Sequence, residues 1–199
     1  MVYSDLQAFL RVLEQEKELH RVKVEVDPEL EITEIVTRVV KEQGPALLFE
    51  HVRGSPYPLA INILGSRRRI ELALGRHPQA LGEEIAQFLD RVNPPTVKAL
   101  WKSRGFLRRL LAHRPTRVRR APCQEVVEQP PDLTLLPALK CWPDDGGRFL
   151  TLPLVLTRDP QSGHRNLGIY RMQVFSRDSA GMHWQIQKGG SFHYFRAVQ

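Results

Sequence analysis

The regular spacing of apolar residues disappears between residues 113 and 147, and this break divides the chain. The segment is rich in proline, which lacks a backbone N–H donor and interrupts both helices and sheets. Helix and strand patterns alternate before the break, whereas strand patterns dominate after it. We therefore expect an α+β protein with an N-terminal α/β domain (1–112), a Pro-rich connector or irregular arm (113–147) and a β domain (148–199).

The first 112 residues carry four or five helical patterns and three strand patterns. Ser4 is a suitable N-cap for the first helix. Asp27 and Pro28 indicate the start of a second helix, and Gly44 indicates its end. Strand patterns occupy residues 20–26, 46–52 and 58–65, and helical patterns occupy 5–19, 27–44, 70–74, 79–92 and 96–112.

The segment from 148 to 187 predicts three consecutive antiparallel strands. The first places alternate leucines on one face, from Leu150 to Leu156. The second is LGIYRMQVFSRD, which forms a hairpin with the first, and the third is MHWQIQ. KGGSFHYFRAVQ then interrupts the sheet and begins a helix. Both faces of these strands are apolar and their edges are open, so residues 1–112, a partner or the remainder of a longer protein must cover them.

Composition and charge exclude several classes of protein. The chain lacks a signal-peptide pattern and an apolar run of 18 residues, so we expect a cytoplasmic protein. Cys123 and Cys141 form no zinc or CxxC pattern and are expected to be small buried residues. Residues 102–120 hold eight Lys or Arg and no acid. This run predicts a solvated helix or contact with an acidic partner. Duplex nucleic acid is a further alternative, but we expect no nucleic-acid binding because recognition motifs are lacking.

The strand between His164 and Asp178 is unusual because polar side chains interrupt its apolar residues. Asn166 offers an amide oxygen suited to Mn²⁺ or Mg²⁺, and Arg171 offers a guanidinium that can hold a carboxylate. Taken alone, Asn166 is equally well explained as an ordinary turn asparagine. Arg171 is equally well explained as an exposed charge whose apolar stem covers the edge of an apolar surface. A regular strand points them to opposite faces. Both can reach one ligand only if Asn166 lies at the turn or Gly168 introduces a bend or bulge.

Several spaced motifs resemble the UbiD family of decarboxylases: PALLFEHVRGSPYPLAINILGSRRRIELALG, PCQEVV, DLTLLPALKCWP, WPDDGGRFLTLPLVLTRDP and RNLGIYRMQVFSRDSAGMHWQIQKGG. The resemblance covers residues 4–199 and implies the N-terminal domain of those longer enzymes, followed by the first strands of a split β-barrel of the flavin-reductase type. It also implies a carboxy-lyase that reversibly decarboxylates an aromatic or α,β-unsaturated acid. A polyprenyl-hydroxybenzoate-type precursor of ubiquinone or menaquinone is one such acid.

The resemblance further implies cofactors and residue roles. The cofactors are prenylated FMN, Mn²⁺ (or Mg²⁺) and K⁺, and the catalytic residue is Arg171. The metal-ligand positions are Asn166 and Gln187, and the cofactor-binding positions are Thr151, Ile169, Tyr170, Arg171 and Gln187. The family has histidine where this chain has Gln187, which predicts weaker binding of transition metals. The enzymatic interpretation requires Thr151, Asn166 and Arg171 to converge on one hollow.

The resemblance leaves part of the chemistry outside this sequence. The family's remaining metal ligand and its acid/base glutamates have no counterpart here, so we expect the 199 residues alone to be inactive. The implied partners are a small carboxylic acid substrate, a prenyl-flavin synthase that supplies the cofactor, and either further copies or a completing chain. A polyprenylated substrate would add peripheral membrane contact. The alternative is a non-catalytic remnant or companion subunit of a UbiD-like complex.

Overall fold

The computed structural model describes residues 3–114 and 116–199, which fall into two compact units. A helical unit combines the described residues of 1–15 and 64–127, and a β-rich unit combines 16–63 with 128–199. Each unit is discontinuous in sequence. The domain boundaries at residues 112 and 147 remain a prediction.

The β-rich unit contains a three-stranded sheet of β1 (Leu19–Val26), β2 (Ala46–Val52) and β3 (Leu59–Ile61). β1 and β2 are parallel, β3 is antiparallel to β2, and α2 (Glu31–Lys41) provides the crossover that a parallel pair requires. The two predicted longer strands are confirmed, while the third is shorter than predicted. The buried core consists of Val26, Ile32, Leu47, Phe49, Val52 and Leu139.

Part of the Pro-rich segment packs into this core, as an irregular arm would. Leu139 is only 4% exposed and forms an isolated bridge with Phe149. The next residue, Lys140, donates its N–H to the Pro28 carbonyl and accepts the N–H of Leu30. Residues 138–140 therefore extend the β-rich unit rather than serving only as a linker.

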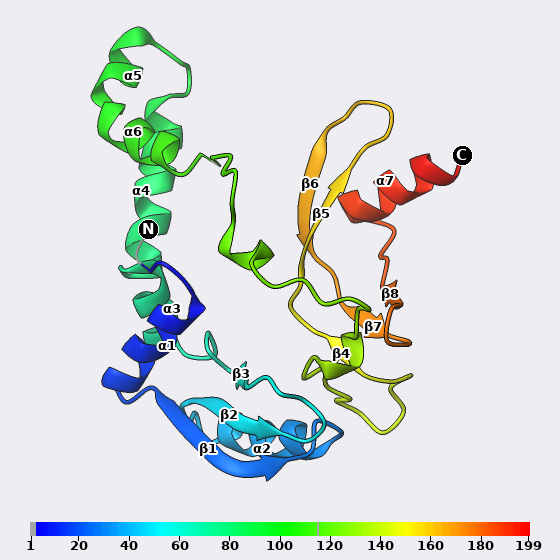
Figure 1. Ribbon diagram of the computed structural model, residues 1–199. Helices are drawn as coiled ribbons and strands as arrows, with labels where there is room; N and C mark the ends of the chain where they lie inside the picture. The colour runs from blue at the N-terminus through cyan, green and yellow to red at the C-terminus, as the bar shows by residue number, and fades with distance from the viewer. Residues whose placement is uncertain (1–2, 115) are drawn as a thin grey trace. The chain divides into compact units, whose positions relative to one another are not determined.

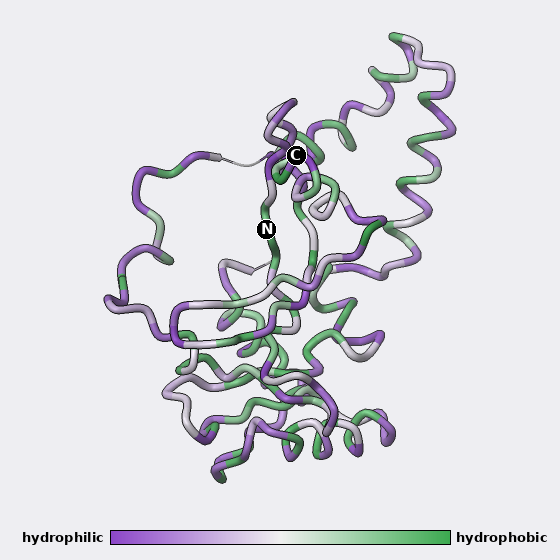
Figure 2. Tube along the Cα trace, turned by 90° about the vertical axis from the view of Figure 1, so that its right-hand side faces the viewer, coloured by the Kyte–Doolittle hydropathy of each residue, from purple (hydrophilic) through white to green (hydrophobic). Residues whose placement is uncertain are grey.

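The helical unit contains α1 (Leu6–Gln15), α3 (Arg67–Leu74), α4 (Pro78–Arg91), α5 (Val97–Lys102) and α6 (Arg104–Ala112). α6 runs back along α4, and the rings of Phe88 and Phe106 stack with centroids 4.5 Å apart. Among the helices of residues 3–114 and 116–199, none combines the length and the apolar character that a membrane span requires, and the hydropathy changes repeatedly along the trace (Figure 2).

Several predicted helix boundaries are wrong, including the end of the first helix, which lies at Gln15 rather than at residue 19. The carboxylate of Asp5 accepts a 2.7 Å hydrogen bond from the N–H of Ala8, so Asp5 rather than Ser4 caps α1. This hydrogen bond lowers the pKa of Asp5. α2 begins at Glu31 because Asp27 instead accepts the N–H of Glu29 in a local turn. The helix predicted over 96–112 is interrupted at Ser103, which ends α5 and begins α6, so the described part of 1–112 has six helices.

The three-stranded antiparallel meander predicted after residue 147 is also wrong. The first two predicted strands divide into four, which are β4 (Phe149–Leu150), β5 (Leu154–Arg158), β6 (Arg165–Ile169) and β7 (Met172–Val174). The third, predicted at residues 182–187, is replaced by β8 (Ala180–Met182), which overlaps it only at Met182. β5 and β6 form a hairpin, whereas β7 lies between β4 and β8 in a separate sheet. The chain therefore changes sheets at residues 151–153 and again at 170–171. The predicted C-terminal helix is confirmed as α7 (Gly189–Val198), which lies beside the hairpin (Figure 1).

One face of the β5–β6 hairpin is apolar and exposed. Leu154 pairs with Ile169, and Leu156 pairs with Leu167. These four side chains are between 50% and 69% exposed. The predicted alternation is therefore confirmed for Leu154 and Leu156, which share this face, but Leu152 lies outside any strand. The opposite face of the hairpin packs against α7.

Candidate functional site

Tyr170 is the most buried of the predicted site residues, at 3% exposure. Its hydroxyl accepts a 2.8 Å hydrogen bond from the backbone N–H of Gly190 and a 3.2 Å hydrogen bond from Nδ2 of Asn166. The ring of Trp184 packs edge-on against the phenol, with centroids 5.4 Å apart. Tyr170 therefore joins the end of β6 to the first turn of α7.

Two glycines permit this close approach. A Cβ atom at Gly189 would lie 2.7 Å from Oδ1 of Asn166, and one at Gly190 would lie 2.6 Å from the Tyr170 hydroxyl. Any side chain at either position would push these groups apart. Sequence reasoning missed both residues as part of the site. The available signal was the pair of adjacent glycines within a segment expected to begin a helix.

Neither geometric condition for joining Asn166 and Arg171 is met inside the strand. Asn166 pairs with Thr157 within β6 rather than lying at the turn, and the register continues without a bulge through Gly168. Gly168 is needed for a different reason, because the ring of Tyr170 folds back to within 2.6 Å of the position its Cβ would occupy. The bend lies after Ile169, where the chain leaves the hairpin.

Arg171 lies between β6 and β7 in different surroundings from Asn166. Its guanidinium carbon stands 4.0 Å from the ring centroid of Phe149, and Nη1 lies 3.7 Å from Oδ1 of Asp145. The Arg171 side chain is 41% exposed. Within residues 3–114 and 116–199, no hydrogen bond or ion pair joins it to Asn166. These two predicted residues thus belong to separate local clusters.

The remaining predicted residues lie at loops and strand ends. Thr151 is exposed between β4 and β5, and Gln187 is exposed in the turn before α7. The carbonyl of Ile169 accepts a 3.3 Å hydrogen bond from Nζ of Lys188, whose charge also lies 5.4 Å from the Tyr170 ring centroid. The structure therefore gathers Asn166, Ile169 and Tyr170 at the start of α7, while Thr151 and Arg171 have other neighbours.

The donor atoms at this cluster fit only part of a metal site. Asn166 donates its amide N–H to Tyr170, which leaves its oxygen as a possible ligand. Gln187, the other predicted ligand, is an exposed residue of the turn before α7 and carries a second neutral amide. The described residues hold no group of three His, Cys, Asp or Glu that could bind a metal ion. Mn²⁺ and Mg²⁺ prefer several oxygen ligands that include carboxylates. Binding of Mn²⁺, Mg²⁺ or K⁺ therefore remains a prediction.

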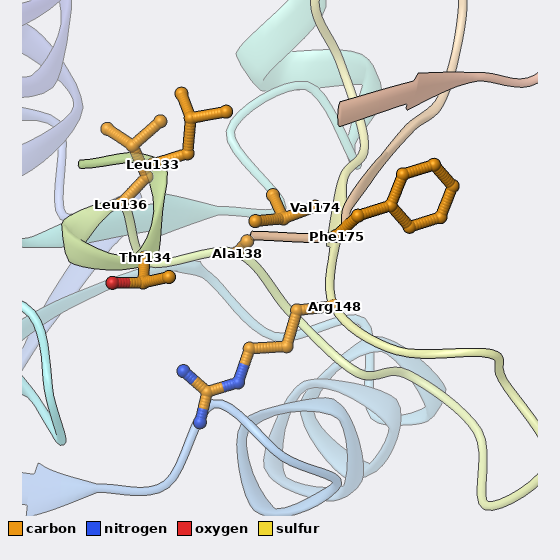
Figure 3. Close-up of a pocket in the computed structure, with 7 residues that line it drawn as sticks. All are labelled: Leu133, Thr134, Leu136, Ala138, Arg148, Val174 and Phe175. Atoms are coloured by element: carbon orange, nitrogen blue, oxygen red, sulfur yellow. The ribbon is translucent and has the colours of Figure 1, made fainter. Parts of the chain in front are cut away.

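A cavity of about 230 Å³ in the β-rich unit is lined by other residues. Figure 3 shows Leu133 and Leu136 on one side of it, with Val174 and Phe175 across from them and Arg148 extending below. None of the predicted site residues lines this cavity. Thr151, Asn166 and Arg171 therefore do not converge on this cavity, and the geometry of these residues does not by itself carry the enzymatic interpretation.

Two family models match successive parts of the chain. Residues 10–89 match the 3-octaprenyl-4-hydroxybenzoate carboxy-lyase N-terminal domain. Residues 115–199 match the 3-octaprenyl-4-hydroxybenzoate carboxy-lyase Rift-related domain. The first match covers α2 and the β1–β3 sheet, and the second covers every strand and helix that surrounds Tyr170.

Several longer proteins are similar in sequence. An uncharacterized protein of Chlamydia trachomatis is 45% identical over 195 residues, covering 98% of this chain and 33% of the relative. A protein of Chlamydia pneumoniae, named as one of the subunits of a 4-hydroxybenzoate decarboxylase, is 40% identical over 98% of this chain and 33% of its own length. An uncharacterized protein of Archaeoglobus fulgidus is 44% identical over 100% of this chain and 41% of the relative. The chain thus spans a third to two fifths of these relatives.

Solved structures share the fold. The closed form of vanillic acid decarboxylase from Sedimentibacter hydroxybenzoicus matches with a TM-score of 0.78 and 29% identity, over 99% of this chain and 40% of that one. An evolved dimeric form of the UbiD-class enzyme HmfF from Pelotomaculum thermopropionicum, in complex with prFMN, matches with a TM-score of 0.74 and 25% identity. That match covers 98% of this chain and 41% of HmfF.

Proposed function

The chain belongs to the UbiD family, and from this premise we propose that it forms the N-terminal part of a carboxy-lyase acting on an aromatic or α,β-unsaturated acid. The observation that carries the proposal is the succession of two UbiD domain matches over residues 10–89 and 115–199. Similar proteins named for 4-hydroxybenzoate and vanillic acid favour a phenolic acid as the substrate. A polyprenyl-hydroxybenzoate-type quinone precursor belongs to this class.

Arg171 is proposed to bind the substrate carboxylate. Phe149 is 6% exposed, and its ring restrains the guanidinium plane at 4.0 Å before any substrate arrives. Asp145 stands 3.7 Å away, which is too long for a hydrogen bond, so it leaves the N–H donors of Arg171 available. A carboxylate could therefore accept two parallel hydrogen bonds from a guanidinium that is already oriented.

Prenylated FMN is the proposed cofactor, because the similar enzyme HmfF binds prFMN. When bound, it would supply the electron sink for the carbanion that forms as CO₂ leaves. Thr151, Ile169, Tyr170 and Gln187 are proposed to position it. Tyr170 suits a positioning role because Gly190 and Asn166 fix its hydroxyl from two sides.

Loss of CO₂ breaks one carbon–carbon bond and leaves an electron pair on the substrate carbon, which must then accept a proton. Asp159, a buried carboxylate, is already ion-paired with Arg196 of α7. We therefore propose that the proton donor and the remaining metal ligands come from the rest of a complete UbiD-type enzyme. The split β-barrel expected around the cofactor would likewise need further strands.

The test is complementation. The chain is produced together with a prenyl-flavin synthase, with and without the part of the Archaeoglobus fulgidus relative that lies outside the match. We expect the pair to retain a yellow chromophore and to release CO₂ from 4-hydroxybenzoate, vanillate or 3,4-dihydroxybenzoate. The chain alone should be inactive. A stable but colourless and inactive pair would overturn the proposal, whereas a coloured, inactive pair would favour a companion-subunit role.

A further inference from the structure

The short helix α5 presents an apolar face to solvent. Val97 is 82% exposed, Leu100 is 43% exposed and Trp101 is 63% exposed. Spacings of three and four residues place these side chains on one side of the helix. Ala99, which is 9% exposed, marks the side that packs inward. Scattered exposed apolar residues are ordinary, but three on one face of a short helix, one of them a tryptophan, indicate an interaction surface.

The same region is strongly basic. No acidic residue occurs between Asp90 and Glu125, and Lys98 and Lys102 lie on α5 itself. The guanidinium of Arg104 stacks 4.0 Å from the Trp101 ring centroid. Arg109 is ion-paired with Glu84 of α4. The other nine basic residues of this segment are Arg91, Lys98, Lys102, Arg104, Arg108, Arg114, Arg117, Arg119 and Arg120.

We propose that α5 and the first turn of α6 form a docking surface for a bilayer that contains anionic phospholipids. Cations attract the negatively charged headgroups, while Val97, Leu100 and Trp101 enter the boundary between headgroups and acyl chains. The proposed contact is peripheral, with the six-residue helix α5 lying along the surface of the bilayer. This inference rests on the helical unit and does not depend on the proposed carboxy-lyase activity.

The combination of charge and apolar exposure favours a lipid surface over nucleic acid. Phosphate recognition would use the cations but would leave Val97 and Leu100 in water. A lipid surface accommodates both, because its headgroups are anionic and its interior is apolar. Trp101 is suited to this boundary, since an indole has a large apolar ring and one N–H donor.

The experiment measures sedimentation of the full 199-residue chain with vesicles of phosphatidylcholine, alone or mixed with phosphatidylglycerol. We expect binding only to the mixed vesicles and loss of binding at about 1 M salt, where charges are screened beyond roughly 3 Å. Lys98→Glu with Lys102→Glu should weaken binding by at least about tenfold. Trp101→Ala should weaken it by about tenfold or more through lost apolar burial.

Matched controls separate the surface from general charge and hydrophobicity. Trp142 is 62% exposed in the β-rich unit, so Trp142→Ala removes an equally exposed tryptophan and should leave binding unchanged. Lys23→Glu with Lys41→Glu makes the same change in net charge on another exposed surface and should have less than about a twofold effect. Equal losses from both pairs of variants would overturn the proposal. So would duplex DNA binding at the same salt that depends on Lys98 and Lys102 but not on Trp101.

Discussion

The hydroxyl oxygen of Tyr170 lies 2.8 Å from the backbone nitrogen of Gly190, twenty residues further along the chain. Gly190 lies in the first turn of α7, where backbone N–H groups have no carbonyl of the same helix to bond to. The hydroxyl of Tyr170, in the segment directly after β6, therefore supplies the hydrogen-bond acceptor that the helix lacks. The contact is buried, which makes it costly to leave either group unpaired.

Tyr170→Phe should destabilise the protein by about 1–3 kcal/mol, because the Gly190 N–H and the Asn166 amide would lose a buried acceptor. Urea unfolding followed by circular dichroism measures the change, and hydrogen exchange at the Gly190 amide should become faster. Tyr194→Phe is the matched control, since Tyr194 is 53% exposed and should change stability by less than about 0.5 kcal/mol. Equal effects from both variants would show that the hydroxyl of Tyr170 contributes nothing specific.

Gly190→Ala and Gly82→Ala should have opposite effects, although both glycines are helical. Alanine has the better intrinsic helix propensity, by about 1 kcal/mol, so Gly82→Ala in α4 should stabilise the protein. Nothing lies within 4 Å of a Cβ at Gly82. At Gly190 the new methyl would meet the Tyr170 hydroxyl at 2.6 Å and Trp184 at 2.9 Å, which should cost about 1–3 kcal/mol. The midpoint of thermal unfolding checks both, and stabilisation at Gly190 would contradict the observed packing.

The fold was predictable where one periodicity runs through a whole element. Strand β1 alternates and β2 begins with the apolar run Ala46–Phe49, so their type could be predicted, and a helix was expected to begin within the segment 188–199 that forms α7. The break at Tyr170–Arg171 gave no such signal, because Tyr170, Met172 and Val174 continue to alternate across it as in one uninterrupted strand. What decides the break is pairing: β6 pairs with β5, whereas β7 pairs with β4 and β8.

The candidate site was only partly predictable for the same reason. Residues four apart in a regular strand are separated by roughly 13 Å, so Asn166 and Tyr170 were not expected to touch. They do because the chain turns after Ile169 and brings the phenol back. The family resemblance drew attention to both residues without predicting this hydrogen bond. The roles of Thr151 and Gln187 remain predictions.

Asp159 should make the stability of the β-rich unit depend on pH in acid. Asp159 is 4% exposed, and its carboxylate accepts hydrogen bonds from the Ser162 hydroxyl and the Gln161 N–H. The carboxylate also forms an ion pair with Arg196 on α7. The Ser162 hydrogen bond is the main cause that lowers the pKa of Asp159 to about 2. Because the pKa is lower in the folded state, the ionised carboxylate stabilises the fold. This contribution is complete at pH values above the unfolded-state pKa, near 3.8, and is lost as the pH falls through the folded-state pKa of about 2.

Asp159→Asn should therefore lower the free energy of unfolding at neutral pH and flatten its dependence on pH between 4 and 2. Urea unfolding measured at several pH values tests this expectation. Asp144→Asn is the control, because Asp144 is exposed and its removal should leave the acid slope unchanged. If the slope between pH 4 and 2 is the same for Asp159→Asn and the unsubstituted chain, Asp159 does not stabilise the fold in its ionised form.

Arg171→Lys tests the proposed role in carboxylate binding, because it keeps the charge and removes the planar fork that lies over Phe149. In the complemented enzyme we expect KM for the acid to rise about 10- to 100-fold, corresponding to the roughly 1.5–3 kcal/mol of a charged hydrogen bond. The matched control is Arg165→Lys on the exposed end of β6, which should leave KM unchanged. Steady-state rates of CO₂ release give both values. If KM is unaffected in Arg171→Lys, the guanidinium does not hold the substrate carboxylate, and the stack on Phe149 serves only the packing of β4 against β7.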